Sequence, residues 1–538
     1  MPEADQVARQ GEEVCHVLAV DLGTGGPKVA LVSPTGRVVA SAFRPVRLNL
    51  IAGGGAEQDP AEWWSAVVAA AREVLGAPAG RPGRVVGLGC TAQWSGTVAV
   101  DREGMPVRPA VIWMDSRGSA AIRRQSGGRV SLLGYDLRKV ARWIRLTGGA
   151  PGQSGKDPTA HILWIREAEP DAYEATYKFL EPVDWLNQRL TGSFRASYDS
   201  IAAHWVTDNR KVRSVHYDAT LMAMAGLEAA KLPDLVAPAT VMGHLRKEAA
   251  DELGLPPGLP VATGTGDLHS AAVGSGAVAD FDAHLYIGTS SWISCHVPFK
   301  KTDPLHNIAS IPAAVPGRYL VADEHETAGA CLEFLRDSII YPDDALATPV
   351  PDGADVYRLF DEMAASVVPG SGGVLFTPWL NGERSPVDDH TIRGGFHNLS
   401  LGTTRAEMVR AVYEGVAFNS LWLLEAVERF CSRRMDTLTF IGGGANSGLW
   451  CQIHADVMGR RIRQAAEPVL ANVRGAAMLA WLALGRVRVE DLPTMSPAAR
   501  TYVPSADPAD RRAYGEMYAE FVNMYKATKA IYRRLNGS

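Results

Sequence analysis

The apolar positions in the first part of the chain alternate between short continuous runs and helical spacing. Residues 14–20 form a continuous apolar run, which predicts a buried strand. Apolar segments on both sides of residues 33–36, Ser-Pro-Thr-Gly, predict a hairpin. Residues 59–75 have apolar residues at helical spacing after an Asp-Pro start, which predicts a helix, and residues 84–93 predict a further strand. The order hairpin, helix, strand indicates an α/β fold.

A related layout recurs in the second half of the chain. Residues 283–297 are typical of a strand, a tight turn and a second strand, and residues 405–430 predict a long helix with a broad apolar face. Residues 437–459 predict a strand, a glycine turn and a helix. We therefore expect two domains of one design, residues 1–275 and residues 276–538.

Two segments fit this layout less regularly. Residues 231–261 are rich in proline and show no clear period, so we expect an irregular segment that wraps the surface before the second domain. Residues 507–535 predict one or two amphipathic helices, whose aromatic residues dock on the rest of the protein.

Composition narrows the class of protein. A chain of 538 residues is too long for a single hydrophobic core. Its 54 basic and 59 acidic residues give a net charge of −5, which argues against nucleic acid or an anionic membrane as the main partner. No apolar run approaches the roughly 20 residues that span a bilayer, and the acidic N-terminal segment is not typical of a signal peptide. The six scattered cysteines indicate buried thiols in a reducing compartment, so we expect a cytoplasmic protein.

The first candidate site is the glycine turn at the end of the first strand, "AVDLGTGGPK". Glycines at a strand end let backbone N–H groups approach a ligand closely, and phosphate is a natural ligand for such a turn. Asp21 would repel a phosphate directly. The glycine turn and Asp21 together therefore suit a metal–phosphate complex in which Asp21 acts through a divalent cation. The alternative is a tight hairpin turn that Asp21 caps.

Three further glycine turns follow. Residues 288–291 are a second candidate phosphate site, and residues 442–448 leave a strand and enter a helix, as nucleotide sites often do. In residues 262–278, Asp267 follows a glycine-rich strand end and precedes a helix of small residues. An acid there can accept a proton from a substrate hydroxyl. The alternative for Asp267 is a helix N-cap.

Taken together and in order, these segments resemble the FGGY carbohydrate kinases, the family that includes xylulokinase, glycerol kinase and ribulokinase. The resemblance runs from about residue 16 to about residue 485. Besides the four turns, it rests on the segments "AEQDPAEWW" (56–64), "VIWMDSRGS" (111–119) and "GGFHNLSLGTTRAEMVRAVYEG" (394–415). Each segment alone is weak, and their common order makes the resemblance strong.

The resemblance implies two ribonuclease-H-like domains of the actin, Hsp70 and hexokinase kind, with the active site in the cleft between them. It implies transfer of the γ-phosphoryl group of ATP, with Mg²⁺, to a hydroxyl of a sugar or polyol. Asp267 takes the place of the general base, and Asp21 takes the place of the acid that organises Mg²⁺. The residues expected to bind the nucleotide and its phosphates are Thr24, Gly25, Gly288, Thr289, Gly329, Gly443, Gly444 and Asn446.

The sugar side resembles the xylulokinase branch most, although it departs from it. The candidate sugar contacts are Gln93, Trp94, Ser95, Trp113, Asp115 and Arg117. Core packing is the alternative for the two tryptophans, and pairing with Asp115 is the alternative for Arg117. Trp94 and Ser95 stand where that branch usually has Met-His, and Leu268 stands where many members have Asn.

These changes remove hydrogen bonds that read sugar hydroxyls, and Trp94 adds a flat apolar wall. D-Xylulose is the leading acceptor. Ribulose, L-xylulose, a pentitol, erythritol or glycerol remains a competitor. Dimers are common in this family, so the resemblance implies a homodimer by analogy.

Two other classes of protein stay open. A degenerate relative that binds sugar or nucleotide for regulation fits the altered sugar side, but the presence of both Asp21 and Asp267 opposes it. An actin- or Hsp70-like ATPase would share the phosphate turns without the Trp-x-Asp-x-Arg segment. Asp323, His325 and Glu326 match no standard metal-site spacing, and we expect an exposed strand end there.

Overall fold

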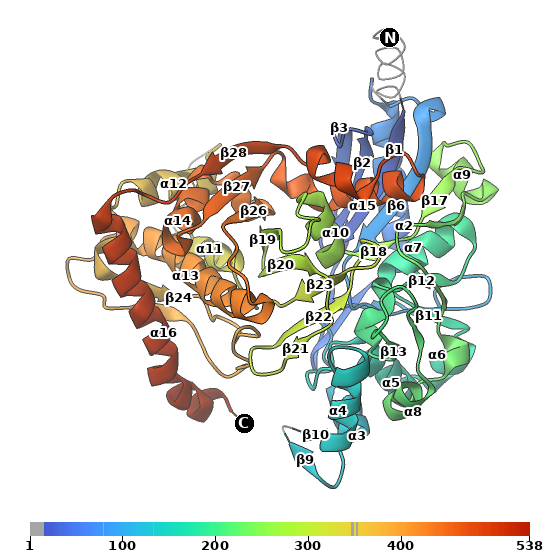
Figure 1. Cartoon of the computed structure of the whole chain (residues 1–538), viewed down its shortest axis with the longest axis horizontal. Coiled ribbons are helices and arrows are strands. Elements are labelled where there is room, and N and C mark those ends of the chain that lie inside the picture. Colours follow the sequence, from blue (N-terminus) through green and yellow to red (C-terminus); the bar gives the residue numbers. More distant parts are fainter. Residues whose placement is uncertain (1–14, 79, 133, 346–348, 351–352, 538) are drawn as a thin grey trace.

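The computed structural model describes residues 15–537 except 79, 133, 346–348 and 351–352. The N-terminal segment that we expect not to be a signal peptide lies almost entirely outside these residues. Two large mixed sheets dominate the fold (Figure 1), so the predicted α/β class is confirmed. Among the described residues, no helix has both the length and the apolar character needed to cross a membrane.

The first sheet contains the predicted hairpin and the strands that follow it. Its order is β16-β17-β6-β1-β2-β3, and β18 also pairs with β6. β1 pairs antiparallel with β2 and parallel with β6, so the ends of β1 and β6 meet at one edge. The strands are β1 (His16–Gly23), β2 (Gly26–Val32), β3 (Val38–Phe43), β6 (Val85–Ala92), β16 (Val241–His244), β17 (Pro260–Ala262) and β18 (Thr265–Gly266).

The second sheet has the order β21-β22-β23-β20-β19-β26-β27-β28. β19 pairs antiparallel with β20 and parallel with β26, so the glycine turns that follow β19 and β26 lie at the same edge. The strands are β19 (Ala283–Ile287), β20 (Ser291–Val297), β21 (Thr302–Asp303), β22 (Ile308–Pro312), β23 (Tyr319–Ala322), β26 (Thr437–Ile441), β27 (Arg461–Ala465) and β28 (Ala498–Tyr502).

Smaller strands build the lobe below the first sheet and one hairpin of the second half (Figure 1). They are β4 (Asn49–Ile51), β5 (Gly55–Gln58) and β8 (Ala110–Val111) in one sheet, with the pairs β7 (Val98–Val100) and β11 (Lys178–Leu180), β9 (Ser131–Leu132) and β10 (Tyr135–Asp136), β12 (Arg195–Ser197) and β15 (Asp234–Val236), β13 (Thr207–Asp208) and β14 (His216–Tyr217), and β24 (Leu375–Thr377) and β25 (Gly395–His397).

The helices of the first half begin where the sequence offers caps. The predicted helix is α2 (Pro60–Gly76), and the side chain of Asp59 accepts a hydrogen bond from the N–H of Ala61 at its start. The others are α3 (Ser119–Ser126), α4 (Leu137–Leu146), α5 (Pro158–Ala168), α6 (Pro170–Ala175), α7 (Pro182–Thr191), α8 (Ala219–Ala225), α9 (Lys247–Leu253) and α10 (Asp267–Gly274).

The helices of the second half include the long predicted one, α13 (Arg405–Cys431), which starts with a capping box between Thr404 and Glu407. The predicted C-terminal segment is a single helix, α16 (Pro508–Asn536), and it packs against α13 and α14. The remaining helices are α11 (Ala330–Phe334), α12 (Val356–Ala365), α14 (Gly448–Met458) and α15 (Ala471–Ala483).

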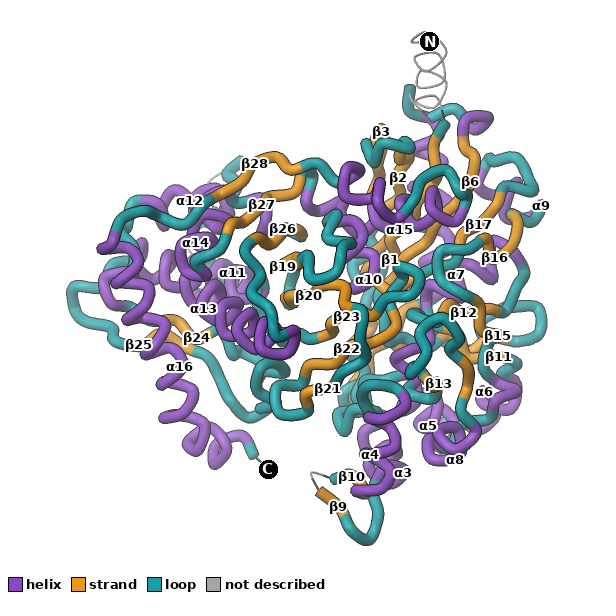
Figure 2. The backbone as a smooth tube through the Cα atoms, viewed as in Figure 1, coloured by secondary structure: helices purple, strands orange, loops and turns teal. Residues whose placement is uncertain are grey.

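α10 and α15 lie between the two large sheets, at the centre of the molecule (Figure 2). α2 covers one face of the first sheet, whereas α15, from the second half of the chain, covers the other face. α10 packs against α15 and against β20 of the second sheet. Small residues allow this close approach, because a Cβ added at Gly274 would lie 1.8 Å from the backbone oxygen of Ala471. The start of α10 is therefore held at the junction of the two sheets.

The proline-rich segment 231–261 differs from the prediction. Instead of wrapping the surface without regular structure, it contributes β16, which extends the first sheet, and α9, which packs against α2. Prolines around these short elements hide their pattern in the sequence. The predicted division of the chain at residue 275 stays a prediction, and the position of α15 shows that the second half also contributes to the core of the first sheet.

Candidate active site

Asp21 lies in β1 and is almost completely buried. It pairs in register with Lys28 on β2, and the Lys28 Nζ lies 3.7 Å from its Oδ2. Burial raises the pKa of the Asp21 carboxyl above its ordinary value, and the nearby ammonium group only partly opposes this shift. The described hydrogen bonds include no cap from Asp21 to the turn that follows it, so the structure gives no support to the capping alternative.

Asp267 is the first residue of α10 and is partly exposed. Its Oδ1 accepts a hydrogen bond from the N–H of Leu268 at 2.9 Å, whereas Gly266 holds the N-cap position. Burial, and then the negative charge of Asp21, raise the pKa of the Asp267 carboxyl to about 7. The two carboxylates therefore lie within electrostatic reach of each other, and Asp267 is not the helix cap.

This carboxylate pair fits a divalent cation that is bound mainly by a substrate. No group of three or more His, Cys, Asp or Glu side chains among the described residues is arranged to hold a metal ion. Mg²⁺ commonly keeps several waters and binds through one or two carboxylates together with phosphate oxygens. Asp21 and Asp267 supply the carboxylates for such an arrangement.

The turn after β19 is locked to the segment before α11. The N–H of Gly329 donates to the carbonyl of Gly288 at 2.9 Å, and the N–H groups of Ala328 and Ala330 donate to the carbonyl of Thr289. A Cβ added at Gly329 would lie 2.3 Å from the Gly288 oxygen, so a side chain does not fit there. Thr289 itself is exposed at the tip of the turn.

The turn after β26 is more open. Gly442 has a φ of +87°, and an added Cβ there would meet the backbone of Ile287. A Cβ added at Gly443 would meet no atom within 4 Å, and Asn446 is exposed. Gly444 packs against the Ile287 side chain. The turn therefore presents an uncovered backbone next to the turn that follows β19.

The residues expected on the phosphate side of the first turn separate into two environments. Gly25 is exposed, and a Cβ there would meet no atom within 4 Å. Thr24 instead contacts the predicted sugar side: its Oγ1 donates to Gln93 Oε1 at 3.1 Å and accepts from Trp113 Nε1 at 3.0 Å. Gln93 in turn donates from Nε2 to Gln58 Oε1 at 2.8 Å. Thr24 thus joins the turn predicted to bind phosphate to the residues predicted to bind the sugar.

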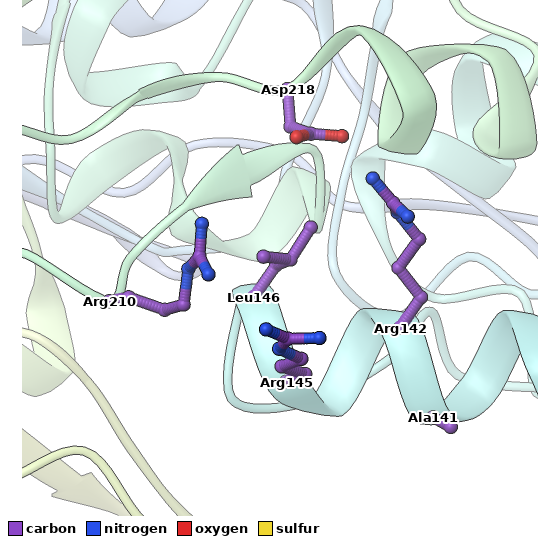
Figure 3. A pocket seen from close by; sticks show the side chains of 6 residues that line it. All are labelled: Ala141, Arg142, Arg145, Leu146, Arg210 and Asp218. Atoms are coloured by element: carbon purple, nitrogen blue, oxygen red, sulfur yellow. The ribbon is translucent and has the colours of Figure 1, made fainter.

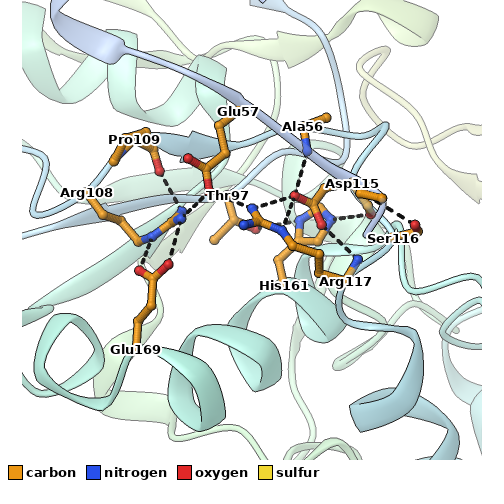
Figure 4. A network of polar contacts seen from close by, with 11 residues as sticks. Ala56, Glu57, Thr97, Arg108, Pro109, Asp115, Ser116, Arg117, His161 and Glu169 are labelled. Carbon is orange, nitrogen blue, oxygen red and sulfur yellow. Dashed lines mark hydrogen bonds and ion pairs between the residues drawn. The ribbon is translucent and has the colours of Figure 1, made fainter. Parts of the chain in front are cut away.

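Asp115 and Arg117 belong to a buried ionic network (Figure 4). Asp115 is fully buried and accepts hydrogen bonds from the N–H of Ala56, the N–H of Arg117 and the Arg117 guanidinium. Arg117 also pairs with Glu57 at 2.5 Å and stacks 3.8 Å over the Trp164 ring. These contacts support the pairing alternative for Arg117, and they fix the segment that follows Trp113.

A histidine joins this network from α5. The Nδ1 of His161 lies 3.2 Å from the hydroxyl of Thr97, and its Nε2 lies 3.4 Å from the carbonyl of Asp115. Burial lowers the pKa of His161 to about 4, so the ring is neutral. Because the ring is neutral, it adds no positive charge beside Arg117, whose own charge is already paired with Asp115 and Glu57.

Trp94 and Ser95 lie at the end of β6 and use their polar atoms within the protein. Trp94 Nε1 donates to the carbonyl of Ser200 at 2.8 Å, and its ring meets His269 edge-on with centroids 5.1 Å apart. Ser95 has a φ of +66°, and its Oγ donates to the carbonyl of Lys156 at 3.1 Å. The indole face and the strained backbone of Ser95 are therefore held in fixed positions.

The comparison with known families decides the class. The model of the FGGY family of carbohydrate kinases, N-terminal domain, matches residues 16–274, and that of the C-terminal domain matches residues 284–484. The chain belongs to the FGGY family of carbohydrate kinases. It is therefore an ATP-dependent phosphotransferase that acts on a sugar or polyol, as the resemblance implied, and an actin- or Hsp70-like ATPase is excluded.

Curated relatives of this FGGY kinase are named xylulose kinases. It is 28% identical over 525 residues to the xylulose kinase of Staphylococcus epidermidis, with 96% of this chain and 97% of that protein covered. It is 30% identical over 471 residues to the xylulose kinase of Streptomyces rubiginosus, with 87% and 88% covered. Both relatives extend over nearly the whole chain.

Solved structures give the same fold. A kinase from Brucella ovis, described as a xyloylose kinase, superposes with a TM-score of 0.82 at 27% identity and covers 96% of this chain and 100% of its own. The glycerol kinase of Plasmodium falciparum with ADP has a TM-score of 0.77 at 17% identity and covers 94% of this chain and 97% of its own. These matches confirm the predicted two-domain, actin-like ATPase architecture.

The kinase has further charged residues around Asp267, and sequence reasoning did not identify Glu324, Arg384 or Lys156 among them. The negative charge of Glu324 contributes to the raised pKa of Asp267, so it lies near the candidate base. Arg384 forms ion pairs with both Glu324 and Glu326. Lys156, from the first half of the chain, lies 3.6 Å from Glu326, so an ion pair joins the two halves of the chain. Arg384 lies about sixty residues after the glutamates, and no local spacing connects them.

The expectation of an exposed strand end at this place is wrong. Asp323 is 8% exposed and His325 is 1% exposed, because the end of β23 is covered by neighbouring strands. Asp323 Oδ1 accepts a hydrogen bond from the N–H of Ile293 at 3.1 Å, and His325 Nδ1 lies 2.8 Å from the Ser291 hydroxyl. The polar residues look like a surface segment in sequence, but their partners lie on β20.

Proposed function

We propose that this kinase transfers the γ-phosphoryl group of ATP to the terminal hydroxyl of D-xylulose, with Asp267 as the general base. The observation that carries this proposal is the proximity of Asp267 to Asp21, which helps to raise the Asp267 pKa to about 7. A base with a pKa near the working pH is deprotonated in a large fraction of the molecules and still binds the proton strongly enough to accept it from a hydroxyl. The names of the relatives support the choice of sugar.

The reaction follows from these positions. Asp267 accepts the proton of the acceptor hydroxyl while the hydroxyl oxygen attacks the γ-phosphorus, and the bond from that phosphorus to the bridging oxygen breaks to release ADP. Mg²⁺, when bound with ATP, would neutralise charge on the phosphate oxygens, and Asp21 is the residue best placed to hold it. The glycine turns after β19 and β26 offer backbone N–H groups to the nucleotide.

The sign of the pH dependence follows from the direction of the pKa shift. Asp267 must be deprotonated to act, and its pKa is raised to about 7. The free enzyme therefore gains active base as the pH rises from about 6 to about 8, and kcat/KM rises over the same interval. An ordinary aspartate would already be fully deprotonated at pH 6.

The experiment is an assay of ADP release by the purified protein with Mg-ATP and a panel of acceptors. The panel contains D-xylulose, D-ribulose, L-xylulose, xylitol, erythritol and glycerol. We expect D-xylulose to give the highest kcat/KM, and the Asp267→Asn variant to lose the sugar-dependent release. If no acceptor raises ADP above the sugar-free background, the proposed transfer to D-xylulose or to another member of the panel is wrong.

A different acceptor is the second candidate, and the contacts of Trp94 and Ser95 favour it. Both side chains use their hydrogen-bonding groups on the carbonyls of Ser200 and Lys156. Fewer groups are then left to bind sugar hydroxyls, which suits an acceptor with a shorter or differently oriented hydroxyl pattern. A higher kcat/KM for another member of the panel would support this candidate.

A degenerate regulator is less well supported, because Asp21 and Asp267 are both present and close together. The homodimer and the cytoplasmic location remain predictions from the resemblance and the composition. Light scattering coupled to size exclusion tests the first, and cell fractionation tests the second.

A further inference from the structure

An open cavity lies at the surface, away from the residues of the proposed active site, and Arg142, Arg145 and Arg210 on its rim are exposed. It has a volume of about 340 Å³ and lies at the C-terminal half of α4, opposite the segment that leads into α8 (Figure 3). Its lining residues are Ala141, Arg142, Arg145, Leu146, Arg210 and Asp218. None of them belongs to the carboxylate pair, the glycine turns or the sugar-side network.

The cavity carries more positive than negative charge. Arg210 pairs with Asp208, which is not among the lining residues, through contacts of 2.6–3.1 Å. Arg142 donates to the neutral hydroxyl of Thr220 at 3.1 Å. Among the described residues, Arg145 makes no hydrogen bond or ion pair through its side chain. In a protein of net charge −5, two guanidinium groups without carboxylate partners thus face one cavity.

The chemistry of the lining defines a class of ligand. Arginine binds phosphate with two parallel hydrogen bonds, and two arginines on one helix can bind one dianion together. Asp218 would repel that phosphate, but its carboxylate can accept a hydrogen bond from a hydroxyl. Ala141 and Leu146 offer an apolar surface to carbon atoms. The volume exceeds what a free phosphate ion fills.

We propose that this cavity binds the phosphate monoester of a small hydroxylated carbon skeleton, with Arg142 and Arg145 on the phosphate and Asp218 on a hydroxyl. The residues of this site are separate from those proposed to bind ATP and the acceptor. It therefore does not depend on which sugar the kinase phosphorylates.

Both walls of the cavity are attached to the second half of the protein. Lys300 Nζ donates to the carbonyl of Ile144 in α4 at 2.8 Å. The Tyr319 hydroxyl donates to the carbonyl of Asn209, next to Arg210, at 2.8 Å. A ligand that joins α4 to the segment 210–218 stabilises the walls against which Lys300 and Tyr319 pack, and by linkage it stabilises the folded protein.

The test is calorimetric titration of the full-length protein, without ATP or acceptor, at constant ionic strength. The three probes are ribose 5-phosphate, inorganic phosphate and ribose. We expect ribose 5-phosphate to bind more tightly than inorganic phosphate, and ribose to show no binding at this site. Equal affinities for ribose 5-phosphate and inorganic phosphate would overturn the assignment of a carbon skeleton.

Variants separate this site from binding in the cleft. Arg145→Ala and Arg142→Ala are each expected to weaken ribose 5-phosphate about tenfold or more, whereas Arg138→Ala, on the same helix but outside the cavity, leaves the affinity unchanged. Asp218→Asn keeps a good N-cap for α8 and removes the charge that repels phosphate. It is therefore expected to strengthen the binding of inorganic phosphate and to narrow the advantage of ribose 5-phosphate over inorganic phosphate, because the charged acceptor for the hydroxyl is lost. If Arg142→Ala and Arg145→Ala both bind as the wild type does, the proposed site does not exist.

Discussion

The two regions predicted to bind the nucleotide and the sugar are built by opposite means. At the edge of the second sheet, the turns after β19 and β26 expose backbone, and the close approach of Gly329 to the Gly288 carbonyl leaves no room for a side chain there. On the first half, Arg117, Asp115 and Glu57 are side chains that are already paired with one another. The first region depends on the absence of side chains, and the second depends on specific partners. Substitutions should therefore affect the nucleotide and the sugar separately.

The largest effect should come from the residue between these two regions. Asp267→Ala removes the proposed base, and we expect kcat to fall about 10²–10⁴-fold because general base catalysis contributes that much. Calorimetry should show that Mg-ATP still binds, since the glycine turns are unchanged. Turnover within a few-fold of the wild type would remove Asp267 from the mechanism.

The next effect distinguishes two glycines of the predicted nucleotide site. A Cβ at Gly329 would lie 2.3 Å from the Gly288 oxygen, whereas a Cβ at Gly443 would meet no protein atom within 4 Å. We expect Gly329→Ala to raise the KM for ATP about tenfold, because the turn after β19 must shift, with the KM for the sugar changed much less.

Gly443→Ala is the matched variant for this prediction. The protein itself tolerates the added methyl group, so thermal unfolding should be unchanged. Any rise in its KM for ATP then reports contact between the nucleotide and this turn. If Gly329→Ala changes the KM for sugar and not that for ATP, the assignment of the two sides is reversed.

A smaller effect is expected in the sugar-side network. Arg117→Lys keeps the charge but loses the paired contacts to Asp115 and Glu57 and the stacking over Trp164. We expect the KM for the sugar to rise several-fold. We also expect the protein to lose about 1–3 kcal/mol of stability, because the buried carboxylates of Asp115 and Glu57 lose hydrogen bonds. Steady-state kinetics and denaturant unfolding measure both.

Arg124→Lys is the control for Arg117→Lys. Arg124 pairs with Glu167 at the surface, where the two side chains are 61% and 47% exposed. An exposed pair contributes about 1 kcal/mol or less, so this variant should resemble the wild type in every measurement. Equal effects of the two substitutions would show that the network around Arg117 has no special role.

The smallest effect concerns the ion pair that joins the two halves. Lys156→Ala removes the contact between Lys156 and Glu326, in which Lys156 is 30% exposed. We expect the KM for the sugar to rise about twofold to fivefold and to become less sensitive to salt, since a partly exposed pair is screened. Lys156→Arg should behave as the wild type. An unchanged salt dependence in Lys156→Ala would contradict a role for this pair.

Features with a local signal in the sequence could be predicted, whereas contacts between distant residues could not. Strands, hairpin and glycine turns were predicted because their signals are local: an apolar run that ends in glycine identifies β1 and β26, and an Asp-Pro start identifies α2. The position of Asp267 beside Asp21 was inferred only from the resemblance, since the two residues are far apart in the chain.

Pairing over long separations left no local signal. Arg384 meets Glu324 and Glu326 only in the folded protein. Thr24 is predicted to lie beside the phosphate, and in the structure its hydroxyl contacts Gln93 and Trp113. The edge strand β16 is hidden between prolines, and the buried end of β23 is polar enough to resemble a surface loop. In each case the partner lies on another element, which spacing along the chain does not reveal.

The most direct test of the account is the pKa of Asp267, measured by carboxyl ¹³C NMR with labelled aspartate and assigned with the Asp267→Asn variant. The structure gives a pKa of about 7 in the wild type, raised in part by the charge of Asp21. In Asp21→Asn, the Asp267 pKa should fall. An Asp267 pKa near that of an ordinary aspartate in the wild type, or one unchanged by Asp21→Asn, would contradict the claim that the two carboxylates share one cleft.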